Sequence, residues 1–136
     1  MFIARRVVRM AIEDIGLADP QALVVANAAK EAYDFLGTPE GELALANAVL
    51  YVASAPKSNA AYMAWNKASA LAKSYGSLMP PHTILNAPTK LMKEEGYGAG
   101  YRYDHDEPDA FSGQDYFPEK MGRQRFYDPP DRGFER

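Results

Sequence analysis

The chain changes composition sharply near residue 76. Alanine is the commonest residue before this point, whereas glycine, proline, aspartate and aromatic residues dominate after it. In the first part proline occurs only at Pro20, Pro39 and Pro56, positions spaced like boundaries between helices. Alanine favours helix, and glycine and proline favour turns. The sequence therefore predicts an all-α fold whose first half is helical and whose second half is largely irregular.

Four long helices and one short helix are expected in the ranges 3–17, 20–36, 39–53, 58–75 and 87–95. Residues that cap helices stand at the starts of four of them, and glycine follows several of the ends. The expected caps are Asp19, Thr38, Ser58 and Asn86, and the expected stops include Gly16, Gly37, Gly76 and Gly96. Short turns between alanine-rich helices favour a compact antiparallel helical bundle.

Apolar residues at helical spacing predict which faces of these helices are buried. The stripe of the first helix is Ile3, Val7, Met10, Ala11 and Ile15; that of the second is Ala22, Val25, Ala29, Ala32 and Leu36; that of the fourth is Ala61, Trp65, Ala68 and Ala72.

Residues 43–53 are apolar on almost every side of the predicted third helix. Such a helix lies either at the centre of its bundle or against another subunit, and the sequence leaves both alternatives open. We expect seven residues to be core or subunit contacts, without a division between the two roles: Leu43, Leu45, Val49, Leu50, Val52, Tyr62 and Trp65.

The last forty residues are rich in aromatic side chains. Disordered segments are poor in such residues, so the segment is expected to wrap the bundle and to place its rings in grooves. We therefore predict a single domain over residues 1–136, with a helical core over about 2–96 and an irregular wrapping segment over about 97–136.

Charge and cysteine content exclude several classes of function. The 136 residues carry 15 basic and 18 acidic side chains, a net charge of −3, and no cysteine. The absence of cysteine excludes disulfides, thiolate zinc sites and thiol nucleophiles, and the acidic balance disfavours a free-standing nucleic-acid binder. No apolar run approaches the roughly 20 residues of a membrane span, so a cytoplasmic protein without membrane contact is expected.

Catalytic motifs are missing. There is no phosphate-binding loop and no Gly-x-Ser-x-Gly or His-Glu-x-x-His motif. The strongest candidate is residues 103–109, where carboxylates flank His105 and can bind a divalent cation or transfer protons. Because these residues are adjacent in sequence, a solvated acidic turn is the favoured interpretation. We expect no catalytic, cofactor-binding or metal-binding residues in this chain.

Three arginines, Arg5, Arg6 and Arg9, lie on the first predicted helix. They can contact DNA phosphates, or pair with acids such as Glu13 or with a neighbouring subunit. Basic residues at the start of this helix and acids at its end oppose the helix dipole, and no capping residue precedes it. We therefore expect the helix to begin inside a longer natural protein.

Several strings together carry a family resemblance that covers nearly the whole chain. They are IARR at 3–6, EDIGLADP at 13–20, APKSN at 55–59, NAPTKLMK at 86–93, GYGAGY at 96–101 and QDYFP at 114–118. In this order and spacing they resemble the C-terminal domain of the replication-associated recombination protein A family of AAA+ ATPases, which includes the Werner helicase-interacting ATPases.

The resemblance implies a helical domain similar to the collar of clamp loaders. It implies that this domain holds the subunits of a parent ATPase together as a homotetramer at stalled replication forks, in the cytoplasm and associated with the nucleoid. The parent would use ATP and Mg²⁺ in a module outside this chain, and would meet DNA and single-strand DNA-binding protein. One alternative is a module that itself contacts DNA or that protein, through Arg5, Arg6 and Arg9 or the aromatic segment; a less favoured one is a small metal-dependent enzyme around His105.

Overall fold

Helices are the only regular elements in the structure, a computed structural model that describes all residues from Met1 to Arg136. There is no β-strand, so the predicted all-α class is confirmed. The α-helices are α1 (Phe2–Met10), α2 (Gln21–Leu36), α3 (Glu40–Ser54), α4 (Ala60–Tyr75) and α5 (Lys90–Glu94). Five shorter elements accompany them: a π-helical turn, η1 (Ala11–Ile15), and the 3₁₀ turns η2 (Gly16–Ala18), η3 (His82–Ile84), η4 (Asp104–Asp106) and η5 (Gly133–Glu135).

The chain forms two compact units. Unit 1 consists of Met1–Ala70 together with Phe126–Arg136, and unit 2 consists of Leu71–Arg125. The boundary between them in the helical part falls within α4. The division into a core and a wrapping segment near residue 96 stays a prediction.

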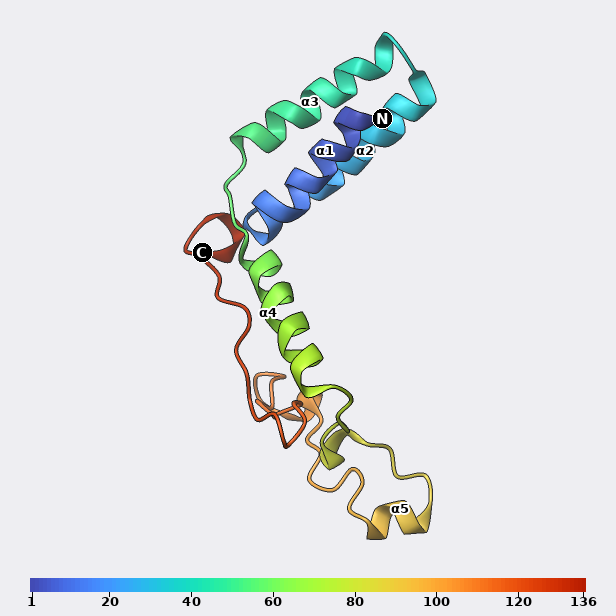
Figure 1. Cartoon of the computed structure of the whole chain (residues 1–136), viewed down its shortest axis with the longest axis vertical. Coiled ribbons are helices and arrows are strands. Elements are labelled where there is room, and N and C mark those ends of the chain that lie inside the picture. Colours follow the sequence, from blue (N-terminus) through green and yellow to red (C-terminus); the bar gives the residue numbers. More distant parts are fainter. The chain divides into compact units, whose positions relative to one another are not determined.

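Three helices of unit 1, α1, α2 and α3, pack against one another, and α2 and α3 form an antiparallel hairpin (Figure 1). Their core is built mostly from alanine, and Ile15 is its only large side chain that is completely buried. Small side chains allow the helix backbones to approach closely. The core residues are Ala4, Val7, Ala11, Ile15, Ala22, Ala26, Ala29, Leu45, Ala48 and Val52.

The predicted boundaries of α2 are confirmed. The Asp19 carboxylate accepts a hydrogen bond from the backbone N–H of Gln21 at 3.1 Å, and Gly37 ends the helix with a φ of +69°. Two other predicted caps are wrong. Thr38 makes no capping bond to α3, which begins after Pro39.

Asn86 does not cap α5, because the helix begins later than expected. Thr89 takes this role, and its hydroxyl accepts a hydrogen bond from the Met92 N–H at 3.2 Å.

The buried face of the first helix differs from the predicted stripe. Val7, Ala11 and Ile15 are buried as expected, but Ile3 and Met10 are exposed and Ala4 is buried in their place. The small Ala4 side chain permits close helix contact. In α2 the predicted Leu36 is likewise exposed.

The prediction that the fourth helix joins the bundle is wrong. α4 makes no extended contact with α1, α2 or α3, and Ala60 is its only buried residue. Ala55, just before the connection to α4, is extended, with a ψ of 151°.

The last eleven residues of unit 1 return to its helical turns. The turn η5 packs on η2, and a β-carbon on Gly133 would lie only 2.1 Å from the Ala18 carbonyl oxygen. Within this segment the Tyr127 hydroxyl donates to Glu135 Oε1 at 2.5 Å. We call Phe126–Arg136 the terminal strap.

Unit 2 contains short helical turns joined by loops. The ring of His82 lies 5.1 Å from that of Tyr97, and the His82 carbonyl accepts a hydrogen bond from the Gly98 N–H at 2.6 Å. Four aromatic side chains of unit 2 beyond residue 100 are exposed: Tyr101, Tyr103, Phe111 and Tyr116. In the terminal strap Tyr127 and Phe134 are also exposed. The placement of these rings in grooves of the bundle stays a prediction.

Candidate subunit interface

The seven residues expected in the core or at a subunit contact separate into two groups. Leu45 and Val52 are core residues of α3, with exposed fractions of 8% and 6%. The other five are exposed: Leu43, Val49, Leu50, Tyr62 and Trp65. Leu43 and Leu50 are each 68% exposed, and Trp65 is 72% exposed. Trp65 is therefore not a core residue of this chain.

Only one side of α3 is covered within the chain. Gly41, Leu45, Ala48 and Val52 face α1 and α2, as their spacing of three and four residues requires. The opposite side carries Leu43, Ala46 and Leu50, with Val49 beside them. Because α3 is apolar on almost every side, the side that α1 and α2 do not cover is an exposed apolar face.

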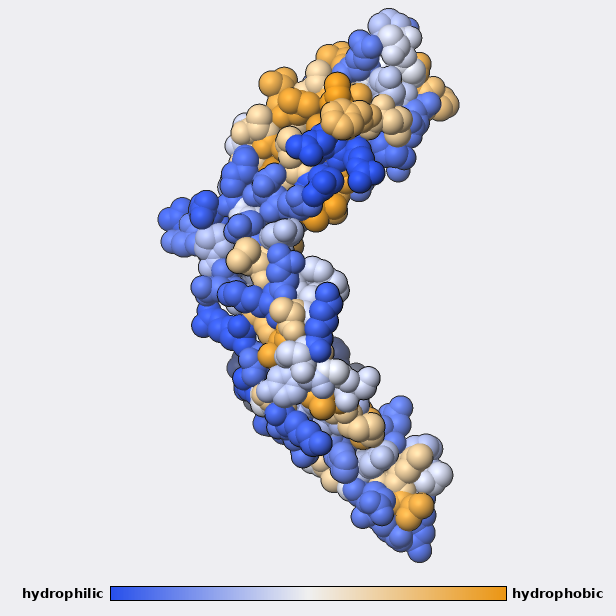
Figure 2. Space-filling view, viewed as in Figure 1, coloured by the Kyte–Doolittle hydropathy of each residue, from blue (hydrophilic) through white to orange (hydrophobic).

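The first turn of α1 extends this face. A groove of about 700 Å³ lies between α1 and α3, and Tyr33 of α2 also contributes to it. The lining residues are Met1, Phe2, Ile3, Tyr33, Glu42, Leu45, Ala46, Val49 and Leu50. Figure 2 shows apolar side chains gathered over α3. We define the α3 patch as the exposed apolar residues Phe2, Ile3, Leu43, Ala46, Val49 and Leu50.

Charged residues stand next to the α3 patch. Glu40 and Glu42 lie in the first turn of α3 and are exposed. Arg5 and Arg6 on α1 are exposed and form no ion pair.

Arg9 is paired with Glu13 on the same helix, as one of the alternatives for the arginine cluster predicted. The Arg9 Nη2 atom lies 2.7 Å from Glu13 Oε1, and this hydrogen bond raises the pKa of Arg9 above its usual value.

A second groove runs along α1 and α2. It has a volume of about 500 Å³, and Arg5, Arg9 and Lys30 line it together with Val8 and Asn27. Lys30 is also paired with Asp34 at 3.1 Å. The groove is therefore basic, although two of its three cations have acidic partners.

Polar residues near the ends of α3 fix the helices in place. The Lys57 ammonium donates to the Val52 carbonyl at 3.0 Å and to the Ala55 carbonyl, so it caps the last turn of α3. Ser58 is buried, and its hydroxyl accepts a hydrogen bond from the Ala60 N–H at the start of α4. The role of Ser58 at the start of α4 agrees with its predicted position as a cap.

One contact of this region is not visible in the sequence. The Tyr51 hydroxyl donates to Asp19 Oδ2 at 2.8 Å, which joins α3 to the start of α2 and raises the pKa of Tyr51. The two residues are 32 positions apart, so no local motif could have indicated the pair.

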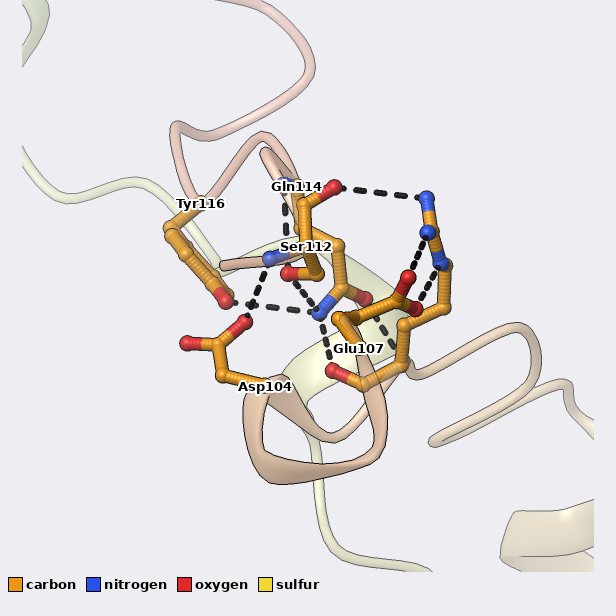
Figure 3. Close-up of polar contacts among 6 residues, drawn as sticks. Asp104, Glu107, Ser112, Gln114 and Tyr116 are labelled. Carbon is orange, nitrogen blue, oxygen red and sulfur yellow. Dashed lines mark hydrogen bonds and ion pairs between the residues drawn. The ribbon is translucent and has the colours of Figure 1, made fainter. Parts of the chain in front are cut away.

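The acidic segment around His105 forms hydrogen bonds within unit 2. Arg102 is paired with Glu107 at 2.6 Å, and Asp104 Oδ1 accepts a hydrogen bond from the Ser112 N–H at 2.9 Å (Figure 3). Hydrogen bonding from Ser112 lowers the pKa of Asp104. The ring of His105 lies beside Tyr103, at 5.0 Å between centroids. This geometry is that of a hydrogen-bonded turn.

The structure shows no grouping typical of a phosphate or metal site. The sequence has no phosphate-binding loop, and no group of three or more histidine, aspartate or glutamate side chains is arranged to hold a metal ion. None of the helices has the length and hydrophobicity needed to span a membrane.

Comparison with known proteins identifies the family. The family model "MgsA AAA+ ATPase C terminal" matches residues 1–136, the whole chain. The chain belongs to the MgsA AAA+ ATPase C-terminal family. The resemblance found in the sequence strings is therefore confirmed.

Curated relatives of the chain include two bacterial proteins named replication-associated recombination protein A. The one from Coxiella burnetii is 58% identical over 98% of this chain, and the one from Escherichia coli K12 is 48% identical over 99%. The ATPase WRNIP1 of Dictyostelium discoideum is 43% identical over 94%. The chain spans about 30% of the length of the two bacterial relatives and 15% of the third.

Proposed function

We propose that this domain joins the subunits of an AAA+ ATPase that acts in replication-associated recombination. The observation that carries the proposal is the α3 patch, whose members lie on two neighbouring helices and, except for Leu43, line one groove. Connected apolar surface of this kind marks an interaction site in soluble proteins. Self-association would remove it from water.

A homotetramer requires either one contact that closes a ring or two different contacts. α4 offers a second surface, because Tyr62 and Trp65 are exposed on it. Tyrosine and tryptophan are enriched among the residues that contribute most to binding energy at interfaces. Two such contacts in one subunit suit a closed tetramer with two-fold axes. We also propose that the aromatic residues of 97–136 gain partners in the assembled protein.

Light scattering on the 136-residue chain tests this proposal. At micromolar concentration we expect the mass of a tetramer, or of a dimer that becomes a tetramer as the concentration rises. A chain that remains monomeric at the highest attainable concentration would contradict the proposal.

The remaining activities belong to the parent protein in this proposal. Binding and hydrolysis of ATP with Mg²⁺ would take place in the part of the parent outside this chain, and the chain itself would catalyse no reaction. The parent would act in the cytoplasm at the nucleoid and would meet DNA and single-strand DNA-binding protein there. Purified chain should therefore hydrolyse no ATP, whereas a parent protein of the relatives' length should do so.

A direct contact with DNA is the second candidate function. It is favoured by Arg5 and Arg6, which have no acidic partner, and by the basic groove beside Arg5. Contacts with phosphates weaken as salt rises. Binding to single-stranded or forked DNA that falls with salt, and that is lost in the triple variant Arg5→Ala, Arg6→Ala, Arg9→Ala, would support this function. No binding at low salt would exclude it.

A further inference from the structure

The charges around the α3 patch follow an order along the helices. α1 and α3 run in the same direction, because each is antiparallel to α2 (Figure 1). Glu40 and Glu42 are in the first turn of α3, and Glu42 lines the groove beside Phe2 and Ile3. The acidic end of the patch is therefore the end at which α3 begins.

The basic end of the patch lies further along α1. Residues three and four positions apart share one face of a helix, so Arg6 lies on the same face of α1 as Phe2 and Ile3, one turn further along the helix. Moving from the start of α3 along the patch, the surface thus changes from acidic at Glu42, through the apolar residues, to basic at Arg6.

The charges at the two ends of the α3 patch are not neutralised within the chain. Glu42 and Arg6 are exposed, and neither forms an ion pair. A two-fold axis through the middle of the patch reverses the order of charges in a second copy. Acid then faces base at both ends, while the apolar residues of the two copies face each other in between.

We propose that the α3 patch binds the same patch of a second copy about a two-fold axis, with Arg6 of each copy opposite Glu42 of the other. This inference rests on the proposed function, since it names the surface through which the chain self-associates. The apolar residues supply the driving force, and the two ion pairs fix the register. Other surfaces, such as that of α4, would join the resulting dimers.

Charge reversal tests the pairing. The variants Arg6→Glu and Glu42→Arg should each weaken the dimer about tenfold, because the axis places the resulting like-charge contact in the interface twice. Combining both changes in one chain should restore most of the affinity. Mixing the two single variants should do the same, since one copy then carries acids at both positions and the other carries bases. Sedimentation equilibrium measures all four samples.

Two controls keep the result interpretable. Glu31→Arg reverses an exposed charge on α2 outside the patch and should leave the dimer unchanged. Leu50→Glu should abolish the dimer, while circular dichroism shows that the helices remain, because the Leu50 side chain is 68% exposed.

The possible outcomes separate this inference from the proposed function. If the chain associates but the effects of the two reversals simply add, with no recovery in the double variant or the mixture, the pairing is wrong and self-association stands. Unchanged association in Leu50→Glu would show that another surface is used. A monomeric wild-type chain would overturn both proposals.

Discussion

A β-carbon on Gly41 of α3 would lie 2.7 Å from the Cα atom of Tyr33 on α2. No pair of carbon atoms packs at this distance, so the close approach of the two helices requires glycine at this position. The neighbour is backbone and cannot move aside as a flexible side chain would.

Gly41→Ala should therefore destabilise unit 1. In an open helical site this change usually stabilises, by up to about 1 kcal/mol, whereas overpacking costs about 1–3 kcal/mol. We expect the cost of overpacking to exceed the gain in helix propensity, so the urea concentration at the midpoint of unfolding should fall. An unchanged or higher midpoint would show that the α2–α3 distance is larger than in the structure.

Gly133→Ala should release the terminal strap. The new methyl group would meet the Ala18 carbonyl oxygen at 2.1 Å, in addition to the strain of a residue with φ of +55°. Trypsin should then cleave more rapidly after Arg132. Gly37→Ala is the matched control, because Gly37 also has a positive φ but has no atom within 4 Å of its β-carbon position. Equal effects of the two changes would mean that backbone strain alone is responsible.

Replacing either of two leucines on α3 by alanine should distinguish a core residue from a surface residue. Leu45 is 8% exposed and Leu50 is 68% exposed. At a concentration low enough for the monomer, Leu45→Ala should lower the free energy of unfolding by about 2–5 kcal/mol, and Leu50→Ala should change it by no more than about 0.5 kcal/mol. Similar losses in both variants would contradict the orientation of α3.

Tyr127 should lose its proton late in an alkaline titration. The hydrogen bond to Glu135 raises the pKa of Tyr127 to about 12, and an ordinary tyrosine has a pKa of about 10. Its contribution to stability is thus fully present below about pH 10 and is lost as pH rises toward 12. Subtracting the phenolate absorbance of Tyr127→Phe from that of the wild type should give a curve centred near pH 12. A midpoint near 10 would exclude the bond.

Local signals in the sequence predicted the helical class and several helix ends. Asp19 and Gly37 mark the start and the end of α2 as expected, because capping and helix termination depend on neighbouring residues alone. Thr38 and Asn86 show the limit of the same signals: each can cap a helix, but Thr38 makes no capping hydrogen bond to α3, and Thr89 caps α5 in place of Asn86.

The faces of the helices were harder to predict. In the first turn of α1 the residues Phe2, Ile3 and Ala4 are adjacent and all apolar, so periodicity alone did not distinguish Ala4 from Ile3. Close helix packing selects the smaller residue for the core and leaves the larger one exposed. The apolar run 43–53 indicated that α3 has two apolar sides, but only the fold separates Leu45 and Val52 in the core from Leu43 and Leu50 on the candidate interface.

The terminal strap makes unit 1 discontinuous in sequence, since Leu71–Arg125 intervenes between its two parts. During synthesis the helices α1 to α3 leave the ribosome well before the strap exists. At roughly 5–20 residues per second, the delay is on the order of several seconds, during which η2 lacks its η5 partner. Newly made chains therefore pass through a period in which α1 to α3 are complete but this end of unit 1 still lacks its last contacts.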